Sequence, residues 1–200
     1  MDRLADQFAS RNITLHRAAD AGDAVGKALA MIPAGSSVGF GGSVTLEQTG
    51  ILDKLRARDD VELIDRDLAG SPEEMRELYL GMFGCDVFLT GSNAITEDGR
   101  IVNVDGRGNR VAMIAYGPRK VIVLAGRNKL TAGIGEALER IRETAVPLNL
   151  ERIRSMAGKS PVAPRAEITA KSIWGQVSII ERQIDPERMH LILIDEDLGF

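Results

Sequence analysis

Short apolar segments bounded by turn residues recur along the whole chain. They are rich in Val, Ile, Leu and Phe, and most have apolar residues on both faces. This pattern is typical of parallel β-strands that helices cover on two sides. We predict strands at residues 12–16, 37–40, 61–65, 86–90, 100–104, 120–125, 176–183 and 190–195.

Helical patterns with clear ends lie between these segments. The clearest begins after Ser71, an N-cap residue that is followed by Pro72 at the first helical position and Glu74 at the third. A helix over residues 109–116 is expected to stop at Gly117, because glycine adopts the left-handed cap conformation and a proline follows it. Other apolar stripes predict helices at Val25, Ala28, Leu29 and Ile32, at residues 45–56 with Thr45 and Gln48 as a capping pair, and at Ile134, Leu138 and Ile141.

Alternating strands and helices predict right-handed crossovers, and therefore a Rossmann-like α/β fold with a doubly wound, mainly parallel sheet. There is one local exception. Asp98 and Gly99 lie between two apolar stretches and predict an antiparallel β-hairpin. Residues 158–164 contain two prolines, and we interpret them as a loop within a single domain that spans residues 1–200.

The composition excludes several classes of protein. With one cysteine, Cys85, this chain of 200 residues can form neither an internal disulfide nor a multi-cysteine metal site. A formal net charge of -4 and a pI near 5.3 give no electrostatic reason to bind nucleic acid or an anionic membrane. No apolar run approaches ~18 residues and the first residues lack the core of a signal peptide, so we expect a cytoplasmic protein.

Glycine is frequent, with 21 residues, whereas aromatic residues make up only 4% of the chain. The scarcity of aromatic rings argues against recognition of bases or sugars by stacking. In open α/β sheets, ligands bind beyond the carboxyl ends of the strands. We therefore expect a site formed by residues 41–45, 65–71, 91–96, 105–110 and 126–130.

The first of these segments is a strand that leads through a glycine turn into a helix start. Its backbone amides suit a phosphate or a carboxylate, and a tight turn alone would also explain the glycines. A dinucleotide fingerprint, with Asp65 as the ribose-binding acid, is a poor match because Val44 stands where a glycine or alanine belongs. The candidate ligand-binding residues of this segment are Gly39, Gly41, Gly42, Ser43 and Thr45.

Residues 90–110 hold the densest set of small and polar side chains. The hairpin turn explains Asp98 and Gly99, but not the amide and carboxylate groups beside a helix start. Asp105 is interpreted equally well as a helix N-cap and as a ligand contact. Lys129 is either a charge for an anion or a solvated surface lysine. The candidate ligand-binding residues of this segment are Gly91, Asn93, Asp105, Gly106, Asn109 and Arg110, and Lys129 is the candidate from residues 126–130.

No group of residues identifies a catalytic centre. His16 and His190 lie in terminal strands, far in sequence from the glycine loops, and we interpret them as packed or edge residues. The chain has no Ser-His-Asp spacing and no histidine cluster, so we predict neither a hydrolase triad nor a metal site. Cys85 is interpreted as a small buried hydrophobic residue. We expect no cofactor.

Several of these motifs occur together, and in the same order, in a known family. They lie at residues 37–47, 65–67, 71–74, 87–99, 101–112 and 126–129. Over roughly residues 10–150, and again at its Leu-Gly-Phe end, the chain resembles the LUD-domain family, which includes lactate-utilisation protein C.

The resemblance implies a fold similar to that of ribose-phosphate isomerase, glucosamine-phosphate deaminase and CoA-transferases. It also implies a part in the oxidation of L-lactate to pyruvate, alongside iron–sulfur partner subunits. Many close relatives carry a cysteine-rich stretch near the end, but residues 151–200 contain no cysteine, so we expect no iron–sulfur cluster on this chain. The isomerase relatives have a carboxylate at the place of Asn93, and an amide cannot abstract a proton.

Three functions are compatible with these observations. The leading hypothesis is an accessory or ligand-binding subunit of lactate oxidation that binds a small anionic metabolite and assembles with redox subunits or with copies of itself. The alternative is a stand-alone isomerase or transferase acting on sugar phosphates or CoA esters, with Glu47 or Asp105 as base or nucleophile. The third is a purely structural partner of redox subunits.

Overall fold

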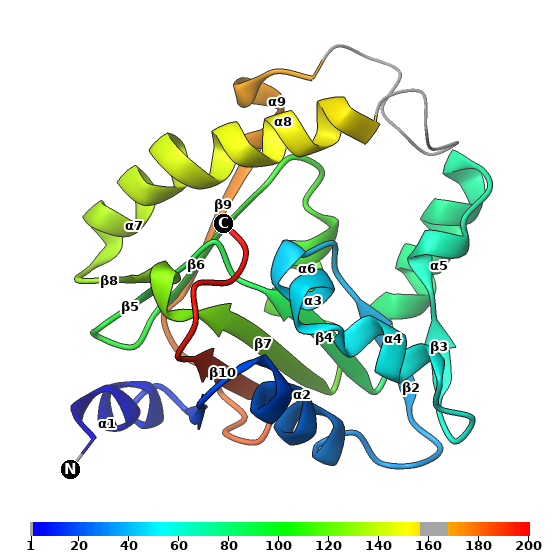
Figure 1. The fold of residues 1–200 in the computed structure, drawn as a ribbon, viewed down its shortest axis with the longest axis horizontal. Coiled ribbons are helices and arrows are strands. Elements are labelled where there is room, and N and C mark those ends of the chain that lie inside the picture. Colours follow the sequence, from blue (N-terminus) through cyan, green and yellow to red (C-terminus); the bar gives the residue numbers. More distant parts are fainter. Residues whose placement is uncertain (1, 157–167) are drawn as a thin grey trace.

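The central sheet consists of six parallel strands (Figure 1). The computed structural model describes residues 2–156 and 168–200. Each predicted segment forms a strand with slightly shifted bounds, and the segment predicted over 176–183 ends earlier, at Ile180. In the order of the sheet, the strands are β1 (Ile13–Ala18), β10 (Met189–Ile194), β7 (Lys120–Gly126), β4 (Val87–Gly91), β2 (Ser37–Phe40) and β3 (Glu62–Ile64).

A second sheet has four strands: β8 (Leu130–Thr131), β5 (Ala94–Thr96), β6 (Ile101–Asp105) and β9 (Gln176–Ile180), in that order. Strands β5 and β6 form the predicted antiparallel hairpin, and Gly99 in its turn has a φ of 90°, which glycine adopts without strain. The hairpin does not interrupt the central sheet. It belongs to a separate sheet, which the sequence did not indicate because its edge strands β8 and β9 come from distant parts of the chain.

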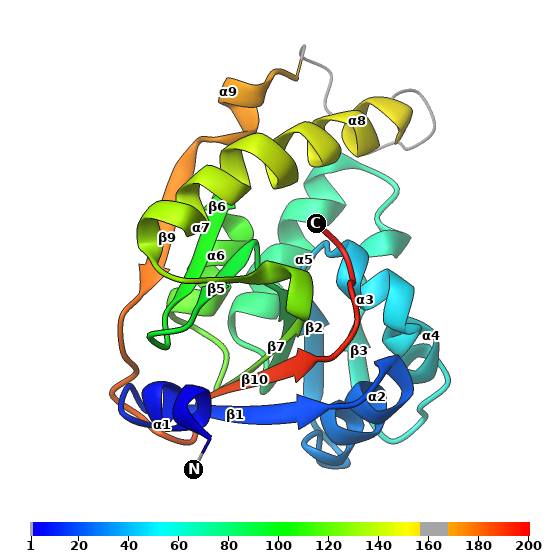
Figure 2. The same ribbon diagram turned by 60° about the vertical axis from the view of Figure 1, so that its left-hand side comes forward.

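Helices cover both sheets (Figures 1 and 2). Two predicted helix ends are confirmed: the hydroxyl of Ser71 accepts the N–H of Glu74 (3.1 Å), and α6 ends before Gly117, whose φ is 104°.

In the described part of the chain, no helix has the length and apolarity to cross a membrane. The bounds are α1 (Arg3–Ala9), α2 (Ala21–Ala30), α3 (Val44–Thr49), α4 (Ile51–Arg56), α5 (Pro72–Phe83), α6 (Asn109–Ala115), α7 (Ile134–Arg140), α8 (Val146–Met156) and α9 (Ala170–Ile173), with the 3₁₀ turns η1 (Arg66–Leu68) and η2 (Arg127–Lys129) and the π-helical turn η3 (Ile141–Ala145).

The single helix predicted over residues 45–56 is wrong in both its continuity and its cap. Gly50 has a φ of 71° and divides the segment into α3 and α4, because a left-handed residue interrupts the helical hydrogen bonds. The helix begins one residue earlier than predicted. Its N-cap is therefore Ser43, whose hydroxyl accepts a backbone N–H of α3, and Thr45 and Gln48 do not form a capping pair.

The helices α1, α8 and α9 have no clear signal in the apolar pattern. Helices α1 and α9 are short, and each is started by a capping side chain, Asp2 and Thr169 respectively. Helix α8 continues from α7 through η3, so that one helical rod runs from Ile134 to Met156 (Figure 1). The loop predicted over residues 158–164 lies outside the described residues.

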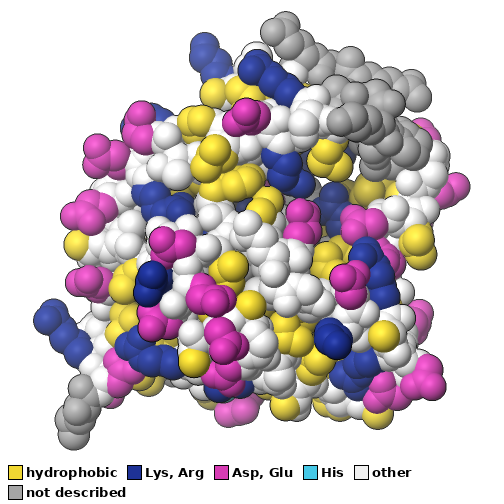
Figure 3. All heavy atoms as spheres, viewed as in Figure 1, with side chains coloured by type: hydrophobic (Ala, Val, Ile, Leu, Met, Phe, Trp, Pro, Cys, Tyr) yellow, Lys and Arg dark blue, Asp and Glu magenta, His cyan; other side chains and the backbone are white. Residues whose placement is uncertain are grey.

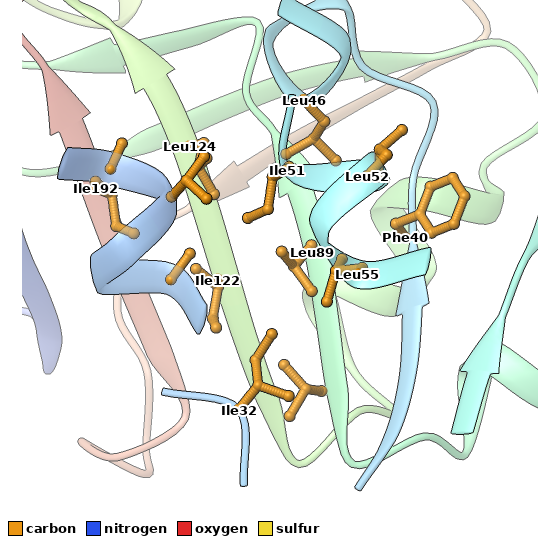
Figure 4. Close-up of a cluster of buried hydrophobic side chains, with 14 of the residues drawn as sticks. Ile32, Phe40, Leu46, Ile51, Leu52, Leu55, Leu89, Ile122, Leu124 and Ile192 are labelled. Carbon is orange, nitrogen blue, oxygen red and sulfur yellow. The ribbon is translucent and has the colours of Figure 1, made fainter. Parts of the chain in front are cut away.

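Alternate side chains of the central strands point to opposite faces and build two hydrophobic cores. In β7, Ile122 and Leu124 face α2, α3 and α4, whereas Val121 and Val123 face α1, α5, α6 and the second sheet. Figure 4 shows the first core, in which Leu89 of the neighbouring strand lies among side chains of α3 and α4. This burial on two sides explains why the strands are continuous apolar runs in the sequence.

The second sheet is also buried on both faces. Its face away from the central sheet holds Ala94, Val102 and Val104, which pack against Ala137 of α7 and Ile141 of η3. This packing fixes the position of the helical rod. As a result, η3 and α8 lie opposite the loops that follow β2 and β4.

The segment after β10 turns back between α3 and η2 (red in Figures 1 and 2). The amide of Asn128 donates to the carbonyl oxygen of Gly199 (3.0 Å) and accepts the N–H of Leu198 (3.2 Å). From the other side, the hydroxyl of Thr45 donates to the carbonyl oxygen of Leu198 (3.3 Å), and Gln48 accepts the N–H of Gly199 (2.6 Å). The final residues therefore cover the start of α3.

Gly39 in β2 leaves no room for a side chain. An added Cβ would lie 2.7 Å from Cγ of Met82, which is fully buried. We expect Gly39→Ala to lower the free energy of unfolding by about 1–3 kcal/mol, the usual effect of overpacking. Chemical denaturation measures this change.

The matched control is Gly26→Ala in α2, where no atom lies within 4 Å of the added Cβ. Alanine favours a helix, so this variant should be more stable than wild type by ~0.5–1 kcal/mol. Equal stability of the two variants would contradict the packing described for Gly39.

Candidate functional site

A cavity of about 190 Å³ lies beyond the carboxyl ends of β2, β4 and β6. Residues of η1 and η2 also line it, as do residues of η3, α8 and α9. Figure 3 shows Lys and Arg side chains in the hollow beneath α8. The cavity is thus where strand ends, a helical rod and the C-terminal segment meet.

Most of the sequence-predicted ligand residues come together around this cavity. Gly39, Gly41 and Thr45 do not line it: Gly39 faces α5, Gly41 packs against the side chain of Arg110, and Thr45 lies behind Lys129. The predicted residues that line the cavity are Gly42, Ser43, Gly91, Asn93, Asp105, Gly106, Asn109, Arg110 and Lys129.

Arg110, in the first turn of α6, is bound to the protein through every N–H group of its guanidinium. Its partners are Asp105 Oδ1 (3.2 Å), the carbonyl oxygens of Gly91 (3.1 Å) and Val104 (3.0 Å), and the side-chain oxygens of Asn93 (2.8 Å) and Asn103 (2.6 Å). It ties the ends of β4 and β6 to the start of α6. Arg110 therefore has no unused donor for a ligand, and Asp105 balances its charge.

The oxygen atoms of Asp105 and Asn93 are also bound within the protein. Asp105 is not the N-cap residue of α6, which is Gly108, but its Oδ2 accepts the N–H of Val111 in the first turn (3.0 Å), while its other oxygen pairs with Arg110. Asn93 Oδ1 accepts the N–H of Val104 (2.9 Å) as well as an N–H of Arg110. For Asn93, no described residue accepts a hydrogen bond from the amide NH₂ group.

Lys129 follows β7 and is buried, with 2% of its surface exposed, so it is not a solvated surface lysine. Its Nζ donates to the hydroxyl oxygen of Thr45 (2.7 Å), and no carboxylate of the described residues forms an ion pair with it. Burial, followed by the positive charges of Arg140 and Arg110, lowers the pKa of Lys129 to about 7. The amine is therefore about half neutral near pH 7.

Arg66 in η1 is a second basic group on the cavity wall. Its guanidinium lies 5.5 Å from the ring centre of Tyr79, and the carboxylate of Asp67 is 3.9 Å from its Nε. This Nε is buried, and it has no hydrogen-bond partner among residues 2–156 and 168–200. An unpaired buried donor costs roughly 1–3 kcal/mol, which an acceptor on a bound ligand would remove.

Three further polar residues of the site were not indicated by the sequence. Arg140 of α7 donates to the carbonyl oxygens of Asn93 (2.6 Å) and Asn128 (2.9 Å) and thereby fixes two of the loops. Asn149 and Arg152 of α8 line the cavity. Their i, i+3 spacing places these two side chains on one helix face, but nothing in the sequence shows which face meets a cavity.

Residues considered for other chemistry have partners elsewhere. Asp65 forms an ion pair with Arg56 (2.7 Å). His16 and His190 contact each other on β1 and β10, with Nε2 and Nδ1 3.2 Å apart. Cys85 is buried as predicted, and burial raises the pKa of its thiol to about 11. Over the described ranges, no three His, Cys, Asp or Glu side chains are grouped so that they could hold a metal ion.

These observations define a Rossmann-like α/β protein with a basic cavity at the carboxyl edge of its sheet. The family model described as the LUD domain matches residues 1–194, and the chain belongs to the LUD domain family. A solved structure of a DUF162 family protein from Deinococcus radiodurans is similar in fold, with 13% identity and a TM-score of 0.56 over 96% of this chain and 94% of that chain. No curated protein matches the sequence.

Lys129 makes the stability of the fold depend on pH. Its pKa is about 7 in the folded protein, compared with 10.5 ordinarily, so above pH 7 the unfolded chain holds a proton that the folded chain has lost. The free energy of unfolding should therefore rise by about 2 kcal/mol from pH 7 to pH 9 through this group. Urea denaturation measures this effect. The free energy of unfolding of wild type, relative to that of Lys129→Met, should increase by this amount from pH 7 to pH 9.

The control for this measurement is Lys54→Met, at an exposed position of α4. Its difference from wild type should be the same at both pH values. If the difference in free energy of unfolding between wild type and Lys129→Met is also the same at both pH values, the pKa of Lys129 is not lowered in the folded protein.

Proposed function

We propose that this chain is an accessory, ligand-binding subunit in the oxidation of L-lactate to pyruvate, and that it holds a small anionic metabolite in the cavity. The observation that carries this proposal is the pair of basic groups, Arg66 and Lys129, that line the cavity without a hydrogen-bonded carboxylate among the described residues. A buried ammonium group without a carboxylate partner and a buried N–H without an acceptor are both costly, and an anion that binds both removes that cost.

The charge balance of the cavity wall supports an anionic ligand. Asp105 is the acidic side chain among the lining residues, and Arg110 already neutralises it. The other charged groups on the wall, Arg66, Lys129 and Arg152, are positive. Arg152 lies 3.9 Å from Glu47, a half-exposed and therefore weak ion pair.

The size of the cavity favours a short ligand. Engineered cavities of about 150 Å³ hold a molecule the size of benzene. A cavity of about 190 Å³ is therefore suited to a carboxylic acid of a few carbon atoms, such as lactate or pyruvate, rather than to an entire CoA ester.

The alternative function, a stand-alone isomerase or transferase, has less support. It requires a free carboxylate as base or nucleophile. Both oxygens of Asp105 are bound to the protein, and Glu47 faces Arg152. Membership of the family supports redox partner subunits, and a cytoplasmic location agrees with a single buried thiol.

The proposal predicts that loss of the Arg66 charge weakens binding. Pyruvate, L-lactate and inorganic phosphate are each added at millimolar concentration, and the melting temperature is recorded. At 100 times its Kd, a ligand stabilises the fold by about 2.7 kcal/mol. Arg66→Gln should raise the Kd of the bound anion about tenfold or more, because a charge-assisted hydrogen bond is worth roughly 1.5–3 kcal/mol.

The matched control is Arg76→Gln on α5, where the arginine side chain is 71% exposed and does not line the cavity. Its Kd should equal that of wild type. If none of these anions stabilises the wild-type protein, or if both variants weaken binding equally, the proposed site is wrong.

A further inference from the structure

Resting on the proposed anion site, we propose that Lys129 binds its ligand covalently, by forming a reversible imine with the keto carbon of a short 2-oxo acid. The ligand class is set by two features of one cavity: a buried primary amine and separate groups suited to a carboxylate. A 2-oxo acid carries a carbonyl next to a carboxylate, and so matches both.

The hydrogen bonding of Lys129 leaves the nitrogen lone pair unused. The Thr45 hydroxyl gives its proton to the carbonyl oxygen of Leu198, so its oxygen can only accept from Lys129. An N–H of the amine makes this contact, at 2.7 Å. Because a donated N–H does not occupy the lone pair, a neutral amine held in this way is still a nucleophile.

The charges around Lys129 favour the neutral amine. Arg110 of α6 and Arg140 of α7 are its cationic neighbours, and both guanidinium groups are fixed by hydrogen bonds to the protein. Asp105, on the same wall, is paired with Arg110. The resulting pKa of about 7 makes the neutral fraction of Lys129 at pH 7 roughly a thousandfold larger than that of an ordinary lysine.

Other groups of the cavity are suited to hold the carboxylate. Arg66 and Arg152 carry positive charge, and the amide NH₂ of Asn93 is an unused donor among the described contacts. Arg110 has no free N–H, and Asp105 balances its charge. If these groups hold the carboxylate, the adjacent carbonyl carbon lies in the same small cavity as the Lys129 amine. The effective concentration of the ketone at the amine is then high.

The reaction needs no oxidant or reductant. The Lys129 nitrogen attacks the keto carbon, a C–N bond forms, and the C=O π electrons become an alkoxide that takes up the proton released by the nitrogen. The resulting carbinolamine loses its hydroxyl group, with a second proton, as water while the nitrogen lone pair forms the C=N bond. One amine and one ketone thus give one imine and one water, and water reverses the reaction.

Reductive trapping tests the proposal in the wild-type protein. The protein is incubated with pyruvate and sodium cyanoborohydride, which reduces an imine to a stable secondary amine in preference to a free ketone, and the labelled lysine is identified by peptide mass mapping. We expect an adduct at Lys129, with the mass of the oxo acid less one oxygen, and at least tenfold less label on exposed lysines such as Lys54. L-Lactate, which has the carboxylate but no carbonyl, should give no adduct.

The pH dependence distinguishes imine formation from simple anion binding. Trapping at Lys129 should increase from pH 6 to pH 8, as the amine loses its proton. Binding of L-lactate should weaken over the same range, because the same proton supplies charge to the cavity. Lys129→Arg should lose the adduct, and Lys54→Arg should retain it.

Each result decides one of the two proposals. If pyruvate raises the melting temperature but no adduct forms at Lys129, the imine is excluded while the anion site stands. If neither stabilisation nor an adduct is found, both proposals fail. Label spread evenly over the exposed lysines would show non-specific reaction and would also exclude the imine.

Discussion

The hydrogen bonds of the Arg110 guanidinium are the interaction on which the cavity depends. They join the end of β4, the end of β6 and the start of α6, which all lie within residues 91–110. A buried guanidinium is stable only when its donors are paired, and here they all are. The same contacts fix the side chains of Asn93, Asn103 and Asp105. The result is a rigid polar network in which the charges of Arg110 and Asp105 balance each other.

Lys129 and Arg66, which line the same cavity, are less completely paired than Arg110. Burial and the charges of Arg140 and Arg110 lower the pKa of Lys129, whose partner in the described chain is the hydroxyl of Thr45 and not a carboxylate. Arg66 is held against Tyr79 with a buried donor unpaired. An anion bound in the cavity would pair with the charge of Lys129 and would offer an acceptor to the unpaired Nε of Arg66. The proposed function and the proposed imine chemistry both rest on these incompletely paired basic groups.

Sequence patterns predicted the helices and strands that are specified by residues close together in the chain. Strand β7 was predicted because it is apolar on both faces, and helix α5 because Ser71, Pro72 and Glu74 specify its start. The sequence pattern did not separate α3 from α4, since the effect of Gly50 depends on its φ. The second sheet was missed because its strands pair residues far apart in the chain, such as those of β6 and β9.

The sequence by itself determined that glycine-rich and polar loops follow buried parallel strands, and therefore that they meet at one edge of the sheet. It could not determine which polar side chains would form their hydrogen bonds within the protein and which would stay free for a ligand. Asp105 and Arg110 pair with each other and with the backbone, whereas Lys129 is buried against Thr45 and faces the cavity. Residues of α8 complete the wall from a distant part of the chain. The tertiary structure decided these outcomes because the pKa and the free donors of a group depend on the partners within a few ångströms of it, whatever their separation in sequence.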